Sequence, residues 1–207
     1  MSRDHESLQN FPAGRDTRSV CQFMENEFCK TLVPTECISY PRSGHHALVD
    51  LLRVYFEDSF VYGEIYRDPA ATLGNLLPPV NYQKNHDFGL LTPVLPERQY
   101  LVQVRNPLES IESWEVFDRR VGHIPETHEA RLDFWTAFVK KWVFADIPNR
   151  LVVCYEDLVG APLETCTAVI QFLTKTQNVD TTHLSRCLER SPLKRRRPHV
   201  PRLYLKA

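Results

Sequence analysis

The sequence lacks any long hydrophobic run. No stretch approaches the roughly 18 consecutive apolar residues that a bilayer-spanning helix needs. The opening MSRDHESLQNF also lacks the apolar segment of a secretory signal. With 207 residues, 43% of them hydrophobic and 25% charged, the chain has enough apolar side chains for one core. We therefore expect a soluble, cytoplasmic, folded protein rather than a membrane-spanning or disordered one.

Cysteines at metal-binding spacing are missing too. The six cysteines form no Cys-x-x-Cys pair and no matching Cys/His pattern, so no metal site is predicted. They are typical of small buried thiols in a reducing compartment. The seven glycines are equally dispersed and no Gly-x-x-x-x-Gly-Lys-Ser/Thr occurs. An ordinary nucleoside-triphosphate hydrolase is therefore disfavoured.

The chain has almost no net charge, but its charges are unevenly distributed. The formal net charge of −1 argues against a nucleic-acid partner. Residues 186–207 hold eight Lys and Arg against one Glu, a local charge of +7, so the rest of the chain sums to −8. A basic segment of this kind is either a solvated tail or suited to a small phosphorylated ligand.

Strand-like and helix-like segments alternate along the chain. This alternation predicts a three-layer α/β domain in which helices flank a short parallel sheet, similar to P-loop folds. We expect one domain over 31–207, preceded by a loosely ordered arm over 1–30. The predicted strands are 36–40, 100–104 and 151–154, and the predicted helices are 47–55, one opening at Pro107, 127–144 and 162–173.

The strongest site signal lies between the first strand and the first helix, in the segment Tyr-Pro-Arg-Ser-Gly-His-His over 40–46. A turn there aims backbone N–H groups and the positive end of a helix dipole at one point. Gly44 lets an anion approach the backbone, and Arg42 supplies positive charge. The alternative is a structural turn with a solvated arginine.

A second anion site is predicted at the end of the next strand. Arg105 should emerge at the carboxyl end of strand 100–104, beside the first turn in a parallel sheet. Ser113, on the following helix, can join it on a second anionic group. Two such sites predict a ligand phosphorylated at two places. The alternatives are an ion pair between Arg105 and Glu109 and an ordinary helix position for Ser113.

These segments resemble the sulfotransferase family that uses 3′-phosphoadenosine 5′-phosphosulfate, or PAPS. Residues 40–44 look like that family's 5′-phosphosulfate loop, and 105–113 like its 3′-phosphate segment. Residues 155–158 are similar to its Tyr-Glu-Asp-Leu strand end, whose tyrosine lies near the adenine, and 189–194 more weakly resemble a nucleotide-contacting turn. The matches follow the family's order. They imply PAPS binding by Arg42, Ser43, Gly44, His45, His46, Arg105, Ser113, Tyr155, Ser191, Arg195 and Arg196.

The sequence departs from the family pattern at three places. Arg42 replaces the usual lysine, which exchanges a point charge for a planar fork. His45 and His46 replace two threonines, and as neighbours they point to different helix faces, which argues against a shared metal. No glycine follows Gly160, so the family's Arg-Lys-Gly closing loop is missing. Either the basic segment 194–197 supplies that charge or the loop is absent.

The resemblance also implies a catalytic pair, Lys84 and His86, in the loop before strand 100–104. A neutral histidine can take the acceptor's proton near pH 7, so we expect His86 to be the general base. Lys84 and Arg42 would neutralise charge on the transferring group. For Asp87 two interpretations remain, a residue that orients the imidazole or an exposed carboxylate.

The predicted function is transfer of a sulfuryl group from PAPS to a hydroxyl, less readily an amine, of a small molecule or glycan, without a metal. Two alternatives stay open. One is a kinase-like nucleotide-dependent phosphotransferase, which would need an acidic residue near the loop to hold Mg²⁺. The other is a noncatalytic nucleotide-binding module that has lost turnover. The sequence carries no signal for the acceptor or for an oligomeric state.

Overall fold

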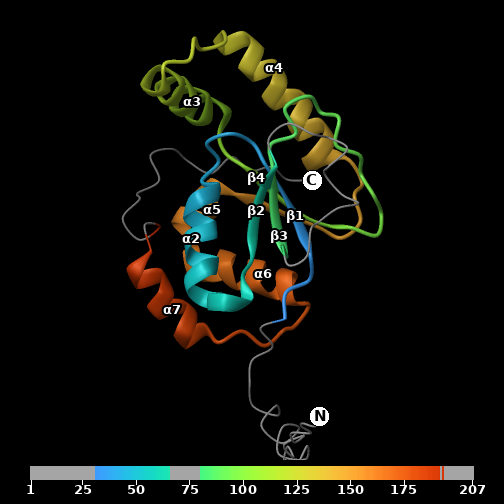
Figure 1. The fold of residues 1–207 in the computed structure, drawn as a ribbon, viewed down its shortest axis with the longest axis vertical. Helices are drawn as coiled ribbons and strands as arrows, with labels where there is room; N and C mark the ends of the chain where they lie inside the picture. Colours follow the sequence, from blue (N-terminus) through green and yellow to red (C-terminus); the bar gives the residue numbers. More distant parts are fainter. Residues whose placement is uncertain (1–30, 66–79, 192, 194–207) are drawn as a thin grey trace, which may run out of the picture.

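A five-stranded parallel sheet forms the centre of the molecule (Figure 1). The computed structural model describes residues 31–65, 80–191 and 193, so the expectations for the arm 1–30, Arg195 and Arg196 lie outside the described residues. The strand order is β2-β3-β1-β4-β5. The strands are β1 (Thr35–Ser39), β2 (Tyr62–Ile65), β3 (Tyr82–Asn85), β4 (Gln99–Val104) and β5 (Arg150–Cys154).

Helices connect β1 to β2 and β4 to β5, because parallel strands need crossover connections, whereas residues 86–98 between β3 and β4 contain no helix. A 3₁₀ turn, Glu57–Ser59, follows the helix that ends at Phe56. A π-helical turn, Lys140–Phe144, continues the helix that ends at Val139. The α-helices of the described residues are α2 (His45–Phe56), α3 (Pro107–Val121), α4 (His128–Val139), α5 (Tyr155–Gly160), α6 (Pro162–Thr174) and α7 (Thr181–Arg190).

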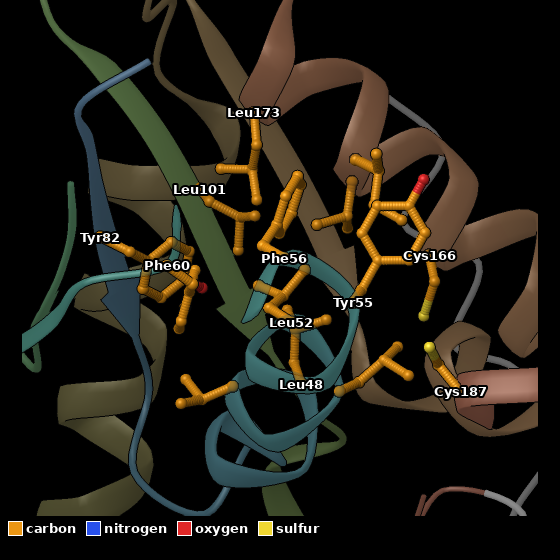
Figure 2. Close-up of a cluster of buried hydrophobic side chains, with 14 of the residues drawn as sticks. Leu48, Leu52, Tyr55, Phe56, Phe60, Tyr82, Leu101, Cys166, Leu173 and Cys187 are labelled. Atoms are coloured by element: carbon orange, nitrogen blue, oxygen red, sulfur yellow. The ribbon is translucent and has the colours of Figure 1, made fainter. Parts of the chain in front are cut away.

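Each face of the sheet carries its own hydrophobic core. Successive side chains of β1 point to opposite faces, so Cys37 joins one core and Ile38 the other. The Cys37 side is covered by α2, α6 and α7, and Figure 2 shows Leu48, Leu52 and Phe56 of α2 within that cluster. On the Ile38 side, α4 and the π turn pack against β4. The three-layer α/β architecture is confirmed.

The structure has two strands that the sequence did not predict. β2 and β3 are four residues each, and β3 reads Tyr-Gln-Lys-Asn, although all four residues are buried. Three polar residues in four hide the apolar signal on which strand prediction depends. The prediction that Lys84 and His86 lie in a loop is therefore wrong for Lys84, which lies within β3. His86 is the first residue after the strand.

The helix predicted over 127–144 is also not uniform. It is α-helical to Val139 and then becomes the π turn, and its apolar residue Leu132 is 42% exposed. The helices predicted at 47–55, from Pro107 and over 162–173 are α2, α3 and α6. Among the described residues, no helix combines the length and the apolar content of a membrane span.

Candidate active site

The carboxyl ends of β3, β1 and β4 open into a cleft of about 920 Å³. Parallel strands end at a common edge of the sheet, which brings residues far apart in sequence together there. The cleft gathers residues from both predicted anion sites and from the predicted catalytic pair. The predicted residues that line it are Arg42, Gly44, His45, His46, Lys84, His86, Arg105 and Ser113.

The loop after β1 has donors and a backbone geometry that could receive an anion. Arg42 and Gly44 have the positive φ angles 65° and 85°, and no side chain caps the start of α2 at Gly44. The N–H groups of a first helical turn have no partner within the helix. Ser43 is fully buried, and its hydroxyl has no hydrogen-bond partner within the described residues. These donors all lie at one helix N-terminus, where the dipole favours negative charge.

Gly44 has a steric reason as well as a conformational one. A Cβ at this position would lie 2.4 Å from Cδ2 of Tyr155. The ring of Tyr155, the first residue of α5, therefore packs directly on the loop backbone. The guanidinium of Arg105 lies over the same ring, 4.3 Å from its centroid. The Tyr155 ring, predicted to lie near the adenine, thus packs between the loop backbone at Gly44 and the guanidinium of Arg105 from the second predicted anion site.

Arg105 makes the ion pair of the alternative interpretation and also lines the cleft. Its Nη2 lies 2.6 Å from Oε2 of Glu109, and its Nη1 donates to the Arg42 carbonyl at 3.4 Å. Ser113 accepts a hydrogen bond from Nε of Arg42 at 3.1 Å. The two predicted anion sites are therefore in contact with each other rather than separate.

Lys84 is a buried cation with a carboxylate partner. It is 3% exposed, and its Nζ lies 3.7 Å from Oε1 of Glu64, the residue opposite it on β2. Burial lowers the pKa of Lys84, while the Glu64 charge acts in the opposite direction. The sequence analysis missed Glu64, because only the β2–β3 pairing places it beside Lys84.

The imidazole of His86 is held in one orientation. Nδ1 lies 2.5 Å from the backbone carbonyl of Ser39, which can only accept, so Nδ1 carries the proton and donates. The lone pair is then on Nε2. Burial, with Lys84 nearby, lowers the pKa of His86 to about 4. His86 is therefore a neutral ring at pH 7, the state that a proton acceptor needs.

Asp87 is not the exposed carboxylate of the second interpretation, and its oxygens bond to groups other than the imidazole. The residue is buried at 5% exposure, so it is not a surface carboxylate. Its Oδ2 accepts from Nζ of Lys141 and Nε1 of Trp142, at 2.7 and 2.8 Å. The imidazole of His86 takes its tautomer from the Ser39 carbonyl instead.

The two adjacent histidines occupy different environments. His45 is 4% exposed, with Nδ1 3.0 Å from Oε1 of Gln103 and Nε2 3.0 Å from the hydroxyl of Tyr62. Burial lowers the pKa of His45 well below its ordinary value. The side chain of His46 is 69% exposed, with Nε2 3.6 Å from Glu64. His45 thus ties the loop to the sheet, whereas His46 faces the cleft mouth.

Ser191 ends α7 and takes part in a local turn. It is 7% exposed, and its hydroxyl accepts from the Leu193 N–H at 3.2 Å. Within the described part of the chain it does not line the cleft. Its role in donor binding stays a prediction, as do the roles of Arg195 and Arg196.

An aromatic wall beside His86 was missed from the sequence. The ring of Phe88 lies 5.1 Å from that of His86 and 5.8 Å from that of Trp114, between centroids. Arg131, 1% exposed, lies over the Trp114 ring and pairs with Asp118. These residues come from three segments with no common spacing, so no sequence motif marks them.

A likeness to a solved structure identifies the architecture. No family model and no curated protein matches this sequence. The crystal structure of mouse sulfotransferase SULT7A1 complexed with PAP aligns with a TM-score of 0.52 and 19% identity. The chain has a sulfotransferase fold. The resemblance seen in the motifs is thus confirmed for the fold, over 76% of this chain.

This chain spans less than two thirds of the length of the mouse structure. The alignment spans 62% of that structure's length. In the chain described here, the fold brings the loop after β1, the end of β3 and the end of β4 to one edge of the sheet, where the cleft opens. The SULT7A1 structure holds PAP.

Proposed function

We propose that this protein is a PAPS-dependent sulfotransferase with a histidine general base. The observation that carries the proposal is the meeting of Arg42, Lys84, His86 and Arg105 on one cleft. Arg42, Lys84 and Arg105 are cations suited to a polyanionic donor, and His86 is a neutral base. The sulfotransferase fold, and the PAP bound in the mouse structure, support the same reaction.

The residues present fit such a donor. The unpartnered Ser43 hydroxyl and the uncapped start of α2 would hold its 5′ end, with Arg42 beside them. Arg105, together with Ser113 next to Arg42, would hold the 3′-phosphate. The ring of Tyr155, which packs against the Arg105 guanidinium, would lie near the adenine. Buried hydroxyls without partners are rare in folded proteins, so the Ser43 group favours a ligand at this loop.

The chemistry follows from the state of each side chain. Bound PAPS supplies an activated sulfuryl group, whose sulfur–oxygen bond to the 5′-phosphate breaks as the acceptor oxygen bonds to sulfur. Nε2 of His86 takes the proton from the attacking hydroxyl. Lys84 and Arg42 neutralise the negative charge that develops on the transferring group and on the leaving phosphate. The fixed positions of these groups lower the barrier without reorganisation.

The acceptor side of the cleft is largely aromatic. Phe88 lies beside His86 and Trp114 beside Phe88, and both rings line the cleft. Phe88 is 49% exposed, which leaves its ring accessible to a ligand. This surface favours a small molecule with an apolar, ring-bearing body over a glycan, because aromatic faces gain most from covering apolar area.

Ligand preference separates this proposal from the kinase-like alternative. Glu64 is an acidic residue near the loop, as a kinase would require, but its carboxylate lies beside Lys84 and His46. We expect adenosine 3′,5′-bisphosphate to raise the melting temperature, because a ligand that binds only the folded state stabilises it. ATP with Mg²⁺ should raise it less. The reverse order would refute the sulfotransferase proposal in favour of a phosphotransferase.

Two variants test the division of labour within the cleft. Arg105→Ala should weaken binding of adenosine 3′,5′-bisphosphate, whereas His86→Ala should leave binding nearly unchanged and abolish transfer. Transfer is followed with ³⁵S-labelled PAPS and a panel of hydroxyl compounds. His128→Ala is the matched control, because the side chain of His128 is 62% exposed and His128 is not among the described residues that line the cleft. Binding without transfer in the unmodified protein, unchanged in His86→Ala, would show a noncatalytic module.

A further inference from the structure

A polar network surrounds Asp87, the residue after His86, and Asp87, Lys141 and Trp142 are not among the described residues that line the cleft. At its centre is the buried carboxylate of Asp87. Oδ2 accepts from Lys141 and Trp142, and Oδ1 accepts from the backbone N–H of Thr92 at 2.8 Å. Charged groups are rarely buried unless they are paired and hydrogen-bonded, and this one is both.

Lys141 is the second centre of the network. Its Nζ donates to Oδ2 of Asp87 at 2.7 Å, to the Leu90 carbonyl at 2.8 Å and to the Thr92 carbonyl at 2.6 Å. An ammonium has three protons, so these contacts account for its whole donor capacity. The turn 87–92 is thereby folded around one cation that comes from a distant part of the chain.

The turn needs such support, because its backbone is unusual. Asp87 and Leu90 have φ angles of 47° and 53°, in the left-handed region that residues with a Cβ seldom adopt. Lys141 and Trp142 belong to the π turn Lys140–Phe144, and both reach the same carboxylate from it. π-helical turns are rare and occur often at functional sites.

His86 lies between this turn and the sheet. On one side, its Nδ1–H donates to the carbonyl of Ser39 on β1. On the other side, the next residue is held by its backbone N–H, which donates to Oδ1 of Asn85 at 2.8 Å, and by the network. The backbone at 86–88 is therefore fixed independently of the imidazole's own hydrogen bond.

We propose that Asp87 and Lys141 are positioning residues for His86. By fixing the turn that follows it, they keep Nδ1–H on the Ser39 carbonyl and direct Nε2 to the cleft. The catalytic consequence rests on the proposed function, but the effect on the imidazole does not. Loss of the Lys141 ammonium should release the turn and let the His86 ring populate other orientations and the other tautomer.

The test compares Lys141→Met with Lys140→Met, since Lys140 is the exposed neighbour in the same π turn. Long-range ¹H–¹⁵N spectra of the histidine rings report the tautomer, and His86→Gln assigns the signals. We expect a dominant Nδ1–H tautomer of His86 in the unmodified protein and in Lys140→Met. Lys141→Met should give averaged nitrogen shifts and a His86 pKa nearer its ordinary 6.5. Unchanged signals in folded Lys141→Met would overturn the proposal.

Lys141→Gln is the milder second variant, because an amide still donates two hydrogen bonds but carries no charge. It should shift the same signals by a smaller amount, and it carries the test if Lys141→Met does not fold. Where transfer is measurable, kcat should fall about tenfold or more while the donor Kd changes less than about twofold, because small misplacements of a catalytic group cost rate rather than binding. Equal kcat in a folded Lys141 variant would refute the positioning role.

The two proposals can fail separately. If no acceptor is sulfated, the tautomer of His86 still reports whether Lys141 positions the ring. If transfer depends on His86 but neither kcat nor the nitrogen shifts respond to Lys141, the sulfotransferase proposal stands and the positioning inference falls.

Discussion

Replacing Gly44 by alanine tests how closely the loop after β1 packs against Tyr155. Two effects add at this position. The φ angle of 85° lies in the left-handed region, which costs a residue with a Cβ about 1–2 kcal/mol. The new Cβ would also lie 2.4 Å from a ring carbon of Tyr155. Overpacking of this kind typically costs about 1–3 kcal/mol.

The ring has little room to move away. Tyr155 is 9% exposed, and the Arg105 guanidinium lies over it. We therefore expect Gly44→Ala to lower the free energy of unfolding by about 2–5 kcal/mol. For a chain of this size, each kcal/mol lowers the melting temperature by about 2–4 °C. Urea unfolding followed by tryptophan fluorescence measures the change.

Two other glycines separate the conformational cost from the steric one. Gly122 has a φ of 78°, and no atom of the described residues lies within 4 Å of the position that a Cβ would take, so Gly122→Ala should bear only the left-handed cost of about 1–2 kcal/mol. Gly160 lies within α5 and is equally uncrowded. Gly160→Ala should therefore raise the free energy of unfolding by about 0.5–1 kcal/mol. If Gly44→Ala cost no more than Gly122→Ala, the close packing against Tyr155 would be refuted.

Two pH dependences follow from the buried titratable groups. Because burial lowers the pKa of His86 to about 4, kcat/KM should fall only as the pH drops through about 4, where the ring becomes protonated; an acid limb near 6.5 in the pH–rate profile would contradict its burial. Burial raises the pKa of Glu36 from 4.5 to about 7, so the folded protein binds the proton more tightly than the unfolded chain. Stability should therefore fall as pH rises from 4.5 to 7. Glu36→Gln should flatten that part of the urea-unfolding profile, whereas Glu112→Gln, at an exposed position, should not; a profile that stays steep in Glu36→Gln would assign the slope to other groups.

The sequence was most informative where one segment carries the whole signal. The strand, loop and helix around Gly44 were predicted together, because the apolar run, the glycine and the helical spacing are adjacent in the chain. The start of α3 was predicted equally well, since Pro107 occupies its first position and Asn106 caps it through local hydrogen bonds. Local patterns of this kind need no knowledge of the rest of the fold.

The sequence was least informative about polar strands and their partners. β3 contains Lys84 and two further polar residues, so its strand character depends on parallel pairing with β1 and β2. The burial of Asp87 and its partners were missed for the same reason. Its partners Lys141 and Trp142 lie 54 and 55 positions away, and nothing in the residues around Asp87 indicates that a π turn packs over it.

By itself, therefore, the sequence determined the alternation of strands and helices, the strand, loop and helix around Gly44, and the order of the motifs along the chain. Only the tertiary structure decided the partner of each charged side chain. Lys84 pairs with Glu64, Asp87 pairs with Lys141, and Arg105 lies over the ring of Tyr155. The physical reason is that backbone preferences and helix caps act over a few residues. The environment of a buried charge, by contrast, is set by whichever distant segments the sheet brings beside it.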